Sequence, residues 1–191
     1  MKKQLWILVG GNGAGKSTFY HQRLEPLGLP FVNADIIARQ LYPDSPEARS
    51  YDAAKIAEQQ RFQLLSQGRS FCFETVFSHP SKIDFVAHAK ALGYEIVLVW
   101  LHLANAELNN ARVSQRVTAG GHHVPEEKVN GRIPRVLNNV RKVLPLCDRV
   151  YVLDNSSLEN PFQRVYTRIG DDVEQHQQPM PIWALDVLAQ S

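Results

Sequence analysis

The chain has 191 residues, which is long enough for one α/β domain with a sizeable core and too short for two ordinary domains. Hydrophobic residues make up 44% of it and charged residues 21%, a balance that excludes a disordered or fibrous protein. The formal net charge of +2 is too small to indicate nucleic acid as a partner. We therefore expect residues 1–191 to form a single domain that does not bind nucleic acid.

The N-terminal segment is too short for a signal sequence. Two lysines precede an apolar run at residues 5–9, and this run ends where a glycine-rich loop begins. No stretch approaches membrane-spanning length, so we expect no membrane partner. Cys72 and Cys147 each lie in or beside an apolar stretch, which favours reduced, buried thiols in a cytoplasmic protein, although a disulfide between them stays open.

The glycine-rich loop matches a phosphate-binding motif. Gly10 to Ser17 fit the pattern G-x-x-x-x-G-K-[ST], with an apolar strand before it and a helix-compatible segment, 17–24, after it. Glycines let backbone N–H groups close around phosphate oxygens, and the following helix N-terminus adds a positive dipole. The lysine would reach the β- and γ-phosphates, and the serine hydroxyl, with the next threonine as a less favoured substitute, would bind Mg²⁺. We expect a nucleoside triphosphate and Mg²⁺ to bind at Gly11, Asn12, Gly13, Ala14, Gly15, Lys16, Ser17 and Thr18.

Asp35 follows the second predicted strand. The first helix should end before Pro26 and Gly28, and residues 31–33 then form a short strand. Ligands of open parallel sheets bind at the carboxyl ends of the strands, which is where Asp35 lies. Its carboxylate is therefore a candidate proton acceptor for a substrate hydroxyl. The alternative is that it caps a short helix over 36–41.

A second acidic residue follows the third predicted strand. A serine and a proline at 45–46 open a long helix that runs to about residue 67, and residues 71–73 form the next strand. Glu74 and Thr75 come directly after that strand, where they could hold Mg²⁺-bound water or the acceptor substrate. The alternative for the glutamate is a rim carboxylate paired with an arginine.

Strands and helices alternate along the rest of the chain. A helix over 80–93 leads to an uninterrupted apolar run at 96–101, which is typical of a strand buried on both faces. Further strands are expected at 150–153 and 162–169, with a polar turn at 154–157 at the edge where a nucleotide base often lies. This alternation predicts an α/β fold with a doubly wound, mainly parallel sheet.

An arginine-rich segment interrupts this alternation. A first helix, a glycine-rich break at 120–125 and a second helix over 126–144 predict a lid at approximately 105–144 that closes over phosphates. Any one of its arginines could instead be a solvated helix charge. His122 and His123 lie in the break without a third ligand at metal-binding spacing, so we expect polar contacts rather than a metal site. The arginines of the lid include Arg112, Arg116, Arg132 and Arg135.

Four stretches together resemble the zeta toxin family of P-loop kinases: GGNGAGKST at 10–18, VNAD at 32–35, FETVFS at 73–78 and RVTAGGHHVPEEKVNGRIPRVLNN at 116–139. The last stretch is the most specific, since P-loops and strand-end acids are shared by many kinases. The resemblance implies the three-layer sandwich of a P-loop NTPase with a helical lid. It also implies a kinase that uses ATP to phosphorylate a hydroxyl of UDP-N-acetylglucosamine, with an antitoxin protein as a candidate partner.

The resemblance assigns roles to the matching residues. It implies that Lys16 and Ser17 bind phosphate and Mg²⁺ and that Asp35 accepts the hydroxyl proton. It also implies that Arg116 and Arg132 stabilise the transferring phosphate. Glu74 and Thr75 fall in the substrate-contacting segment. The segment at 36–67 leaves limited room for a nucleotide-sugar. Two alternatives therefore stay open: a kinase of another sugar or antibiotic hydroxyl, or a nucleotide-binding ATPase switch that acts on a protein partner.

Overall fold

The computed structural model describes residues 2–103 and 126–188. The second predicted lid helix is present as α6 (Glu126–Val143). No helix in these two ranges is both long and apolar enough to cross a membrane. The first half of the predicted lid lies outside the described residues, and with it Arg112, Arg116, His122 and His123.

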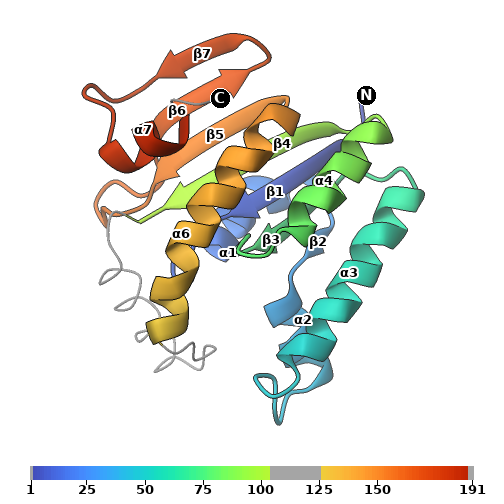
Figure 1. The fold of residues 1–191 in the computed structure, drawn as a ribbon. Coiled ribbons are helices and arrows are strands. Elements are labelled where there is room, and N and C mark those ends of the chain that lie inside the picture. The colour runs from blue at the N-terminus through green and yellow to red at the C-terminus, as the bar shows by residue number, and fades with distance from the viewer. Residues whose placement is uncertain (1, 104–125, 189–191) are drawn as a thin grey trace.

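A seven-stranded sheet forms the centre of the fold, in the strand order β2-β3-β1-β4-β5-β6-β7 (Figure 1). The strands are β1 (Gln4–Val9), β2 (Phe31–Val32), β3 (Phe71–Thr75), β4 (Glu95–His102), β5 (Arg149–Asp154), β6 (Gln163–Ile169) and β7 (Asp172–Gln175). Strands β1 to β5 are parallel, whereas β6 and β7 pair antiparallel at one edge. The predicted α/β fold with a mainly parallel sheet is confirmed.

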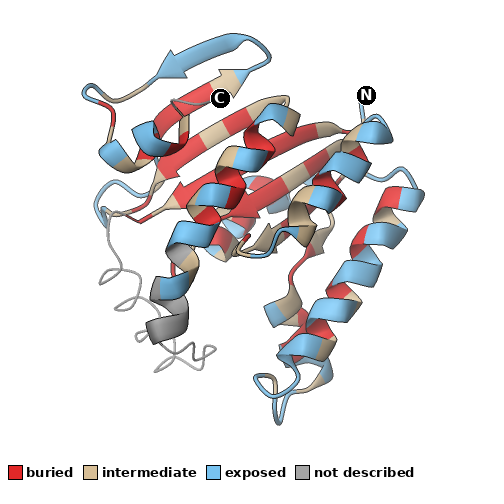
Figure 2. Cartoon of the chain, in the orientation of Figure 1, coloured by how far each residue is buried: buried red, intermediate tan, exposed pale blue. Residues whose placement is uncertain are grey.

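The central strands carry the core because their side chains are buried on both faces (Figure 2). On β1, Leu5 and Ile7 join one hydrophobic cluster, and Leu8 joins the other. The apolar run predicted at 96–101 is the buried middle of β4. β7 differs, since all of its residues are exposed. A polar edge strand has no apolar alternation from which it could be predicted.

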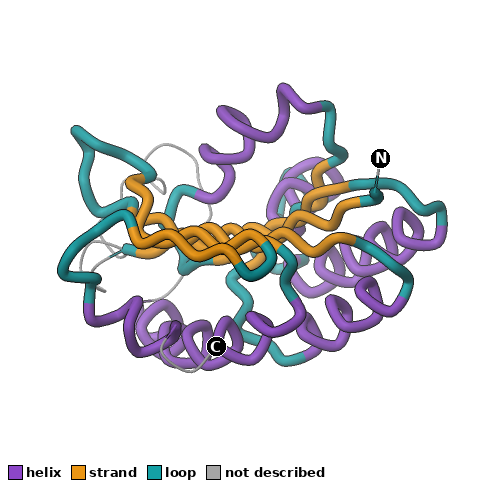
Figure 3. Tube along the Cα trace, turned by 90° about the horizontal axis from the view of Figure 1, so that it is seen from above, coloured by secondary structure: helices purple, strands orange, loops and turns teal. Residues whose placement is uncertain are grey.

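Helices cover both faces of the sheet, but unequally (Figure 3). Besides α6, the helical elements are α1 (Lys16–Phe19), the π-helical turn η1 (Tyr20–Leu24), the 3₁₀ turns η2 (Glu25–Leu27) and η3 (Leu144–Leu146), α2 (Ala34–Leu41), α3 (Ser50–Ser66), α4 (Ser81–Ala91) and α7 (Ile182–Leu188). α3, α4, α6 and α7 pack on the face with the larger cluster, and the α1–η1 segment packs on the other. The result is the three-layer sandwich expected of a P-loop NTPase.

Two helices begin at other residues than predicted. α3 begins at Ser50 and not at the proline of 45–46, because residues 46–49 form a turn. α2 begins at Ala34 because Asn33 caps it: Asn33 Oδ1 accepts hydrogen bonds from the backbone N–H groups of Asp35 (2.8 Å) and Ile36 (3.2 Å). Asp35 therefore lies in the first turn of α2 and is not its cap.

Candidate active site

Two glycines let the glycine-rich loop at residues 10–18, called the P-loop from here on, pass close to neighbouring segments. A Cβ atom at Gly10 would lie 2.4 Å from the backbone oxygen of Leu101, and one at Gly15 would lie 2.4 Å from Asn155 Nδ2. Gly15 also has a φ of 88°, a left-handed conformation that favours glycine. Asn155 follows β5 and donates from Nδ2 to the backbone oxygen of Ala14 at 2.9 Å. The loop thus passes close to Leu101 of β4 on one side and is hydrogen-bonded to Asn155, directly after β5, on the other.

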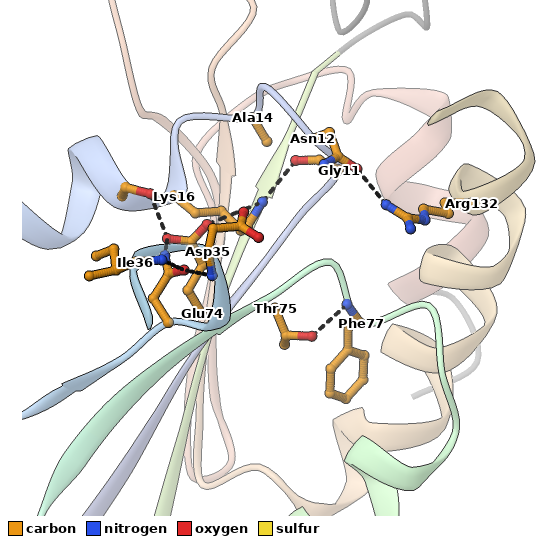
Figure 4. A network of polar contacts seen from close by, with 12 residues as sticks. Gly11, Asn12, Ala14, Lys16, Asp35, Ile36, Glu74, Thr75, Phe77 and Arg132 are labelled. Atoms are coloured by element: carbon orange, nitrogen blue, oxygen red, sulfur yellow. Dashed lines mark hydrogen bonds and ion pairs between the residues drawn. The ribbon is translucent and has the colours of Figure 1, made fainter. Parts of the chain in front are cut away.

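Lys16 begins α1 and turns its ammonium group back over the P-loop. Its Nζ donates to the backbone oxygen of Gly11 at 2.9 Å and lies 3.7 Å from Glu74 Oε1 (Figure 4). The residue is only 6% exposed. Because water screens it little, this charge would attract phosphate oxygens more strongly than a solvated lysine would.

Glu74 lies beside the P-loop because β3 pairs with β1 so that Leu8 is opposite Glu74. Its Oε2 accepts hydrogen bonds from Ser17 Oγ at 2.7 Å and from Asn33 Nδ2 at 2.8 Å. Among the described residues its ion-pair partner is Lys16, and not a lid arginine. The geometry therefore places Glu74 with the phosphate-binding groups.

The oxygen atoms around Ser17 suit Mg²⁺. Magnesium prefers oxygen ligands and is often held by one or two protein side chains together with substrate phosphates and water. The Ser17 hydroxyl and the Glu74 carboxylate, 2.7 Å apart, could supply such a partial shell. The part of the chain that the structure describes has no cluster of three or more His, Cys, Asp or Glu side chains that could hold a metal by itself.

Most of the predicted site residues line one cavity of about 400 Å³. Asp35 is exposed and lines it from the first turn of α2. Gly11, Ala14, Gly15, Ser17 and Thr18 are not among its lining residues. The predicted residues that do line it are Asn12, Gly13, Lys16, Asp35, Glu74, Thr75 and Arg132.

Arg132 of α6 reaches the tip of the P-loop. Its Nη1 donates to Asn12 Oδ1 at 3.2 Å (Figure 4). Arg135, one turn further along α6, is exposed and donates from Nε to the backbone oxygen of Gly131 at 3.0 Å. Of these two arginines, the structure brings Arg132 to the cavity and leaves Arg135 on the helix surface.

The loop after β3 is fixed by two hydrogen bonds. Thr75 Oγ1 accepts from the backbone N–H of Phe77 at 2.9 Å, and Asn139 Nδ2 donates to the backbone oxygen of Phe77 at 2.9 Å. Phe77 has a φ of 65°, which is unusual for a bulky residue, and its side chain is buried in the core. Thr75 thus holds the loop in shape as well as lining the cavity.

Two asparagines have roles that the sequence interpretation missed. Asn33 joins Glu74 to the start of α2, and the preference for asparagine at helix N-caps could have indicated part of this role. Asn155 lies in the turn predicted to face a nucleotide base, but its side chain binds Ala14, 141 residues earlier. Nothing local in the sequence signals that contact.

Besides Lys16 and Arg132, two further cationic side chains line the cavity, one from α3 and one from α4. Arg61 is buried, and Lys82 is partly buried. Burial lowers the pKa of Arg61, and burial together with the neighbouring Arg61 charge lowers the pKa of Lys82. Neither residue belongs to a motif, so neither was predicted.

Solved structures share this fold. The structure of AvrRxo1-ORF1:-ORF2 with ATP superposes with a TM-score of 0.74 and 18% identity, over 93% of this chain and 62% of that chain. The PezAT chromosomal toxin-antitoxin system of Streptococcus pneumoniae superposes with a TM-score of 0.65 and 20% identity, over 87% of this chain and 72% of that chain. This chain thus spans less than two thirds of the AvrRxo1-ORF1:-ORF2 chain, and at these identities the likeness shows the fold alone.

Sequence comparison identifies the family. An uncharacterized protein of Haemophilus influenzae is 30% identical over 139 residues, which are 69% of this chain and 99% of that protein. The profile of the family described as AAA domain (AAA_33) matches residues 5–135. Since this match covers more than half of the chain, from β1 through the first part of α6, the chain belongs to the AAA_33 family of AAA domains.

Proposed function

We propose that this protein is an ATP-dependent kinase that transfers the γ-phosphoryl group to a hydroxyl of a small-molecule acceptor. One observation carries the proposal: Lys16 and Arg132, which can bind phosphate, line the same cavity as the exposed carboxylate of Asp35. A protein that only bound a nucleotide would need the cations, but not an exposed carboxylate in the same cavity. The P-loop NTPase fold supports the same conclusion.

The donor end of the proposed reaction is the P-loop. Its backbone N–H groups and Lys16 would bind the β- and γ-phosphates of ATP. Mg²⁺, when bound, would balance charge on these phosphates. Ser17 would be its protein ligand, and Glu74 would fix the Ser17 hydroxyl through their 2.7 Å hydrogen bond or bind a water of the Mg²⁺ shell.

The acceptor end of the proposed reaction centres on Asp35. The acceptor oxygen attacks the γ-phosphorus, the bond from that phosphorus to the β–γ bridging oxygen breaks, and ADP leaves with the bridging oxygen. The proton of the acceptor hydroxyl passes to the Asp35 carboxylate. Arg132, now bonded to Asn12 at 3.2 Å, would turn to the transferring group and balance its negative charge. By the zeta toxin resemblance, Arg116 would add a second positive charge.

The acceptor itself is the finer part of the proposal. UDP-N-acetylglucosamine follows from the zeta toxin resemblance alone. The PezAT toxin-antitoxin system among the structural neighbours supports an antitoxin as partner. Another sugar or an antibiotic hydroxyl would fit the same chemistry. Thr75 would face the acceptor from the exit of β3, and Glu74, besides its contacts with Ser17 and Lys16, would line the border between the phosphates and the acceptor.

The proposal also covers organisation and location. We assign residues 1–191 to one kinase domain, with a lid at approximately 105–144 that would cover the phosphates during transfer. A cytoplasmic location is supported by Cys72 and Cys147, which are both buried and free. Burial raises the pKa of Cys147 to about 12, so its thiol is unreactive at neutral pH.

Acceptor-dependent consumption of ATP tests the proposal. The protein is incubated with Mg²⁺ and ATP against a panel of nucleotide-sugars, simple sugars, antibiotics and nucleosides, and products are identified by mass. A kinase should consume ATP much faster with one hydroxyl compound and give a product heavier by one phosphoryl group. An ATPase switch would instead respond to a protein, with inorganic phosphate as its product, and that result would contradict the proposal.

A further inference from the structure

The cavity has a cationic wall that the proposed transfer chemistry does not use. Arg61 of α3 and Lys82 of α4 line it together with the site residues. In the proposed transfer, the P-loop N–H groups, Lys16, Arg132 and Arg116 would bind the phosphates of ATP, and neither Arg61 nor Lys82 takes part. The wall made by Arg61 and Lys82 therefore needs its own explanation.

Arg61 is buried without a matching partner. The residue is 5% exposed, and its Nε has no hydrogen-bond acceptor among the described residues. Its only ion pair with a described residue is with Glu58, 3.9 Å away, whose side chain is 49% exposed. A buried cation that lacks hydrogen bonds is destabilising, because the protein replaces little of the hydration that the group has lost.

Aromatic rings fix the Arg61 guanidinium in place. Its Cζ lies 5.2 Å from the ring centre of Phe73, in the middle of β3, and 5.4 Å from that of Phe85 on α4. Such contacts orient the planar group and recover part of the lost hydration energy. The ring contacts do not use the N–H groups of Arg61 as hydrogen-bond donors. The guanidinium is therefore positioned to donate hydrogen bonds to the oxygen atoms of a ligand.

Lys82 brings a second positive charge to the same wall. It lies one helical turn before Phe85 on α4, and its interaction with Arg61 is repulsive. No described carboxylate lies within ion-pair distance of Lys82. Two cations that repel each other in a partly desolvated cavity are stabilised together when an anion binds between them.

We propose that the acceptor carries an anionic group, a phosphate ester or a carboxylate, that binds Arg61 and Lys82 while its hydroxyl faces Asp35. This inference rests on the proposed kinase function and names the substrate class of that site. The acceptor would be held at two points, its charged group at the α3–α4 wall and its hydroxyl at the first turn of α2. Neutral sugars and neutral antibiotics would then be poor acceptors.

A titration with the P-loop already filled tests the subsite. Full-length ¹⁵N-labelled protein is saturated with Mg²⁺ and a non-hydrolysable ATP analogue, and inorganic phosphate or acetate is added at constant ionic strength while chemical shifts are recorded. Wild-type protein should show saturable binding of at least one of the two anions, and the tighter one indicates the chemical group of the acceptor. Arg61→Met and Lys82→Met should each weaken it about tenfold or more, as expected for a charged hydrogen bond. Arg69→Met, an exposed arginine just after α3, is the matched control and should bind like wild type.

A stability measurement separates this role from a packing role. If Arg61 serves a ligand, Arg61→Met removes a buried charge whose ion pair among the described residues is the 3.9 Å contact with the half-exposed Glu58, and it should leave the melting temperature of the ligand-free protein unchanged or raise it. A lower melting temperature together with undiminished anion binding would overturn the subsite. If Arg61→Met does not fold, Lys82→Met decides by the same titration.

The titration also separates the two proposals. Analogue binding without saturable anion binding, or with binding that Arg61→Met and Lys82→Met leave intact, would overturn the subsite and leave the kinase proposal standing. Failure of the analogue to bind would contradict the kinase proposal. The phosphate titration of wild type against Arg61→Met and Lys82→Met would then still test the subsite.

Discussion

The two ends of the cavity differ in how completely their charged groups are bonded. At the P-loop end, the Glu74 carboxylate receives hydrogen bonds from Ser17 and Asn33 and lies 3.7 Å from the ammonium of Lys16. At the α3–α4 end, Nε of Arg61 has no hydrogen-bond partner in the described part of the chain. The first end is organised by the protein's own contacts, whereas the second, by our proposal, would be completed by an anionic group of the acceptor. We infer that the two ends bind different molecules. The P-loop end would bind the phosphates of ATP, a substrate that many enzymes share, and the α3–α4 end would bind the specific acceptor.

The largest effect is expected at the P-loop end. Lys16→Ala removes the cation that would bind the β- and γ-phosphates, so turnover with every acceptor should fall by more than about 10³-fold. ATP consumption and product mass measure the loss. Lys142→Ala removes an exposed lysine of α6 and should retain full turnover. Comparable activity in Lys16→Ala would show that the P-loop end does not act as the donor site.

Asp35→Asn should separate binding from chemistry. The amide cannot accept the hydroxyl proton, so product formation should fall by about 10²–10⁴-fold, the usual contribution of a general base. ATP affinity, measured by calorimetry, should change little, because the hydrogen bonds of Asp35 in the described structure are with Asn33 and Arg39 and not with the P-loop. Asp44→Asn, an exposed carboxylate beyond α2, serves as the control. Undiminished product from Asp35→Asn would remove it as the base.

Arg132→Ala should slow the chemical step by about 10²-fold, because it removes one positive charge from the transferring phosphate. Arg135→Ala is the matched comparison, since Arg135 lies one turn away on α6, is exposed and bonds its own helix. Single-turnover rates measure both variants. Equal rates in the two variants would show that Arg132 does not stabilise the transferring phosphate.

Asn155→Ala should lower the stability of the P-loop conformation and leave the acceptor end of the cavity unchanged. It leaves the backbone oxygen of Ala14 and the N–H of Phe162 without their side-chain partner, a loss worth about 1–3 kcal/mol of unfolding free energy. Denaturant unfolding measures this loss, and KM for ATP should rise while KM for the acceptor stays constant. Asn160→Ala, an exposed residue of the same loop, should change neither. A change in acceptor KM alone would contradict the role of Asn155 in the P-loop.

A smaller effect, on stability alone, is expected at His102, the last residue of β4, which does not line the cavity. Burial lowers its pKa from 6.5 to about 4, and its ring stacks on Trp183 at 4.0 Å. The folded protein therefore favours the neutral form, so this stability is present above pH 6.5 and is lost as the pH falls toward 4. Between pH 7 and pH 5 the loss should be about 1–2 kcal/mol. Urea unfolding should show a weaker pH dependence in His102→Phe, and an identical dependence would contradict this assignment.

The sequence predicted the P-loop end better than the α3–α4 end, for a physical reason. The loop at 10–18 is contiguous, and its glycines and lysine are needed for local contacts. Asp35 and Glu74 could be placed because parallel strands bring their carboxyl ends to one edge of the sheet. The bond from Ser17 to Glu74 was not predicted, because it depends on the register of β1 against β3.

The residues that were missed belong to contacts between distant elements. Arg61 and Lys82 lie on separate helices, and only the packing of α3 beside α4 brings them into one cavity wall. A lone arginine or lysine on a helix is usually solvated, so the sequence favours that interpretation for both. The edge strand β7 was missed because its exposed residues lack an apolar pattern. Long-range packing therefore determines the parts of the site that would choose the acceptor.

The most direct test of the central proposal follows the γ-phosphoryl group itself. ATP labelled in the γ-phosphate is incubated with the wild-type protein, Mg²⁺ and the best acceptor from the screen, and the label is measured in organic ester and in inorganic phosphate. The kinase proposal predicts that most of the label enters the ester and that Asp35→Asn slows this transfer by about 10²–10⁴-fold. Label recovered only as inorganic phosphate, at the same rate with and without the acceptor, would contradict it.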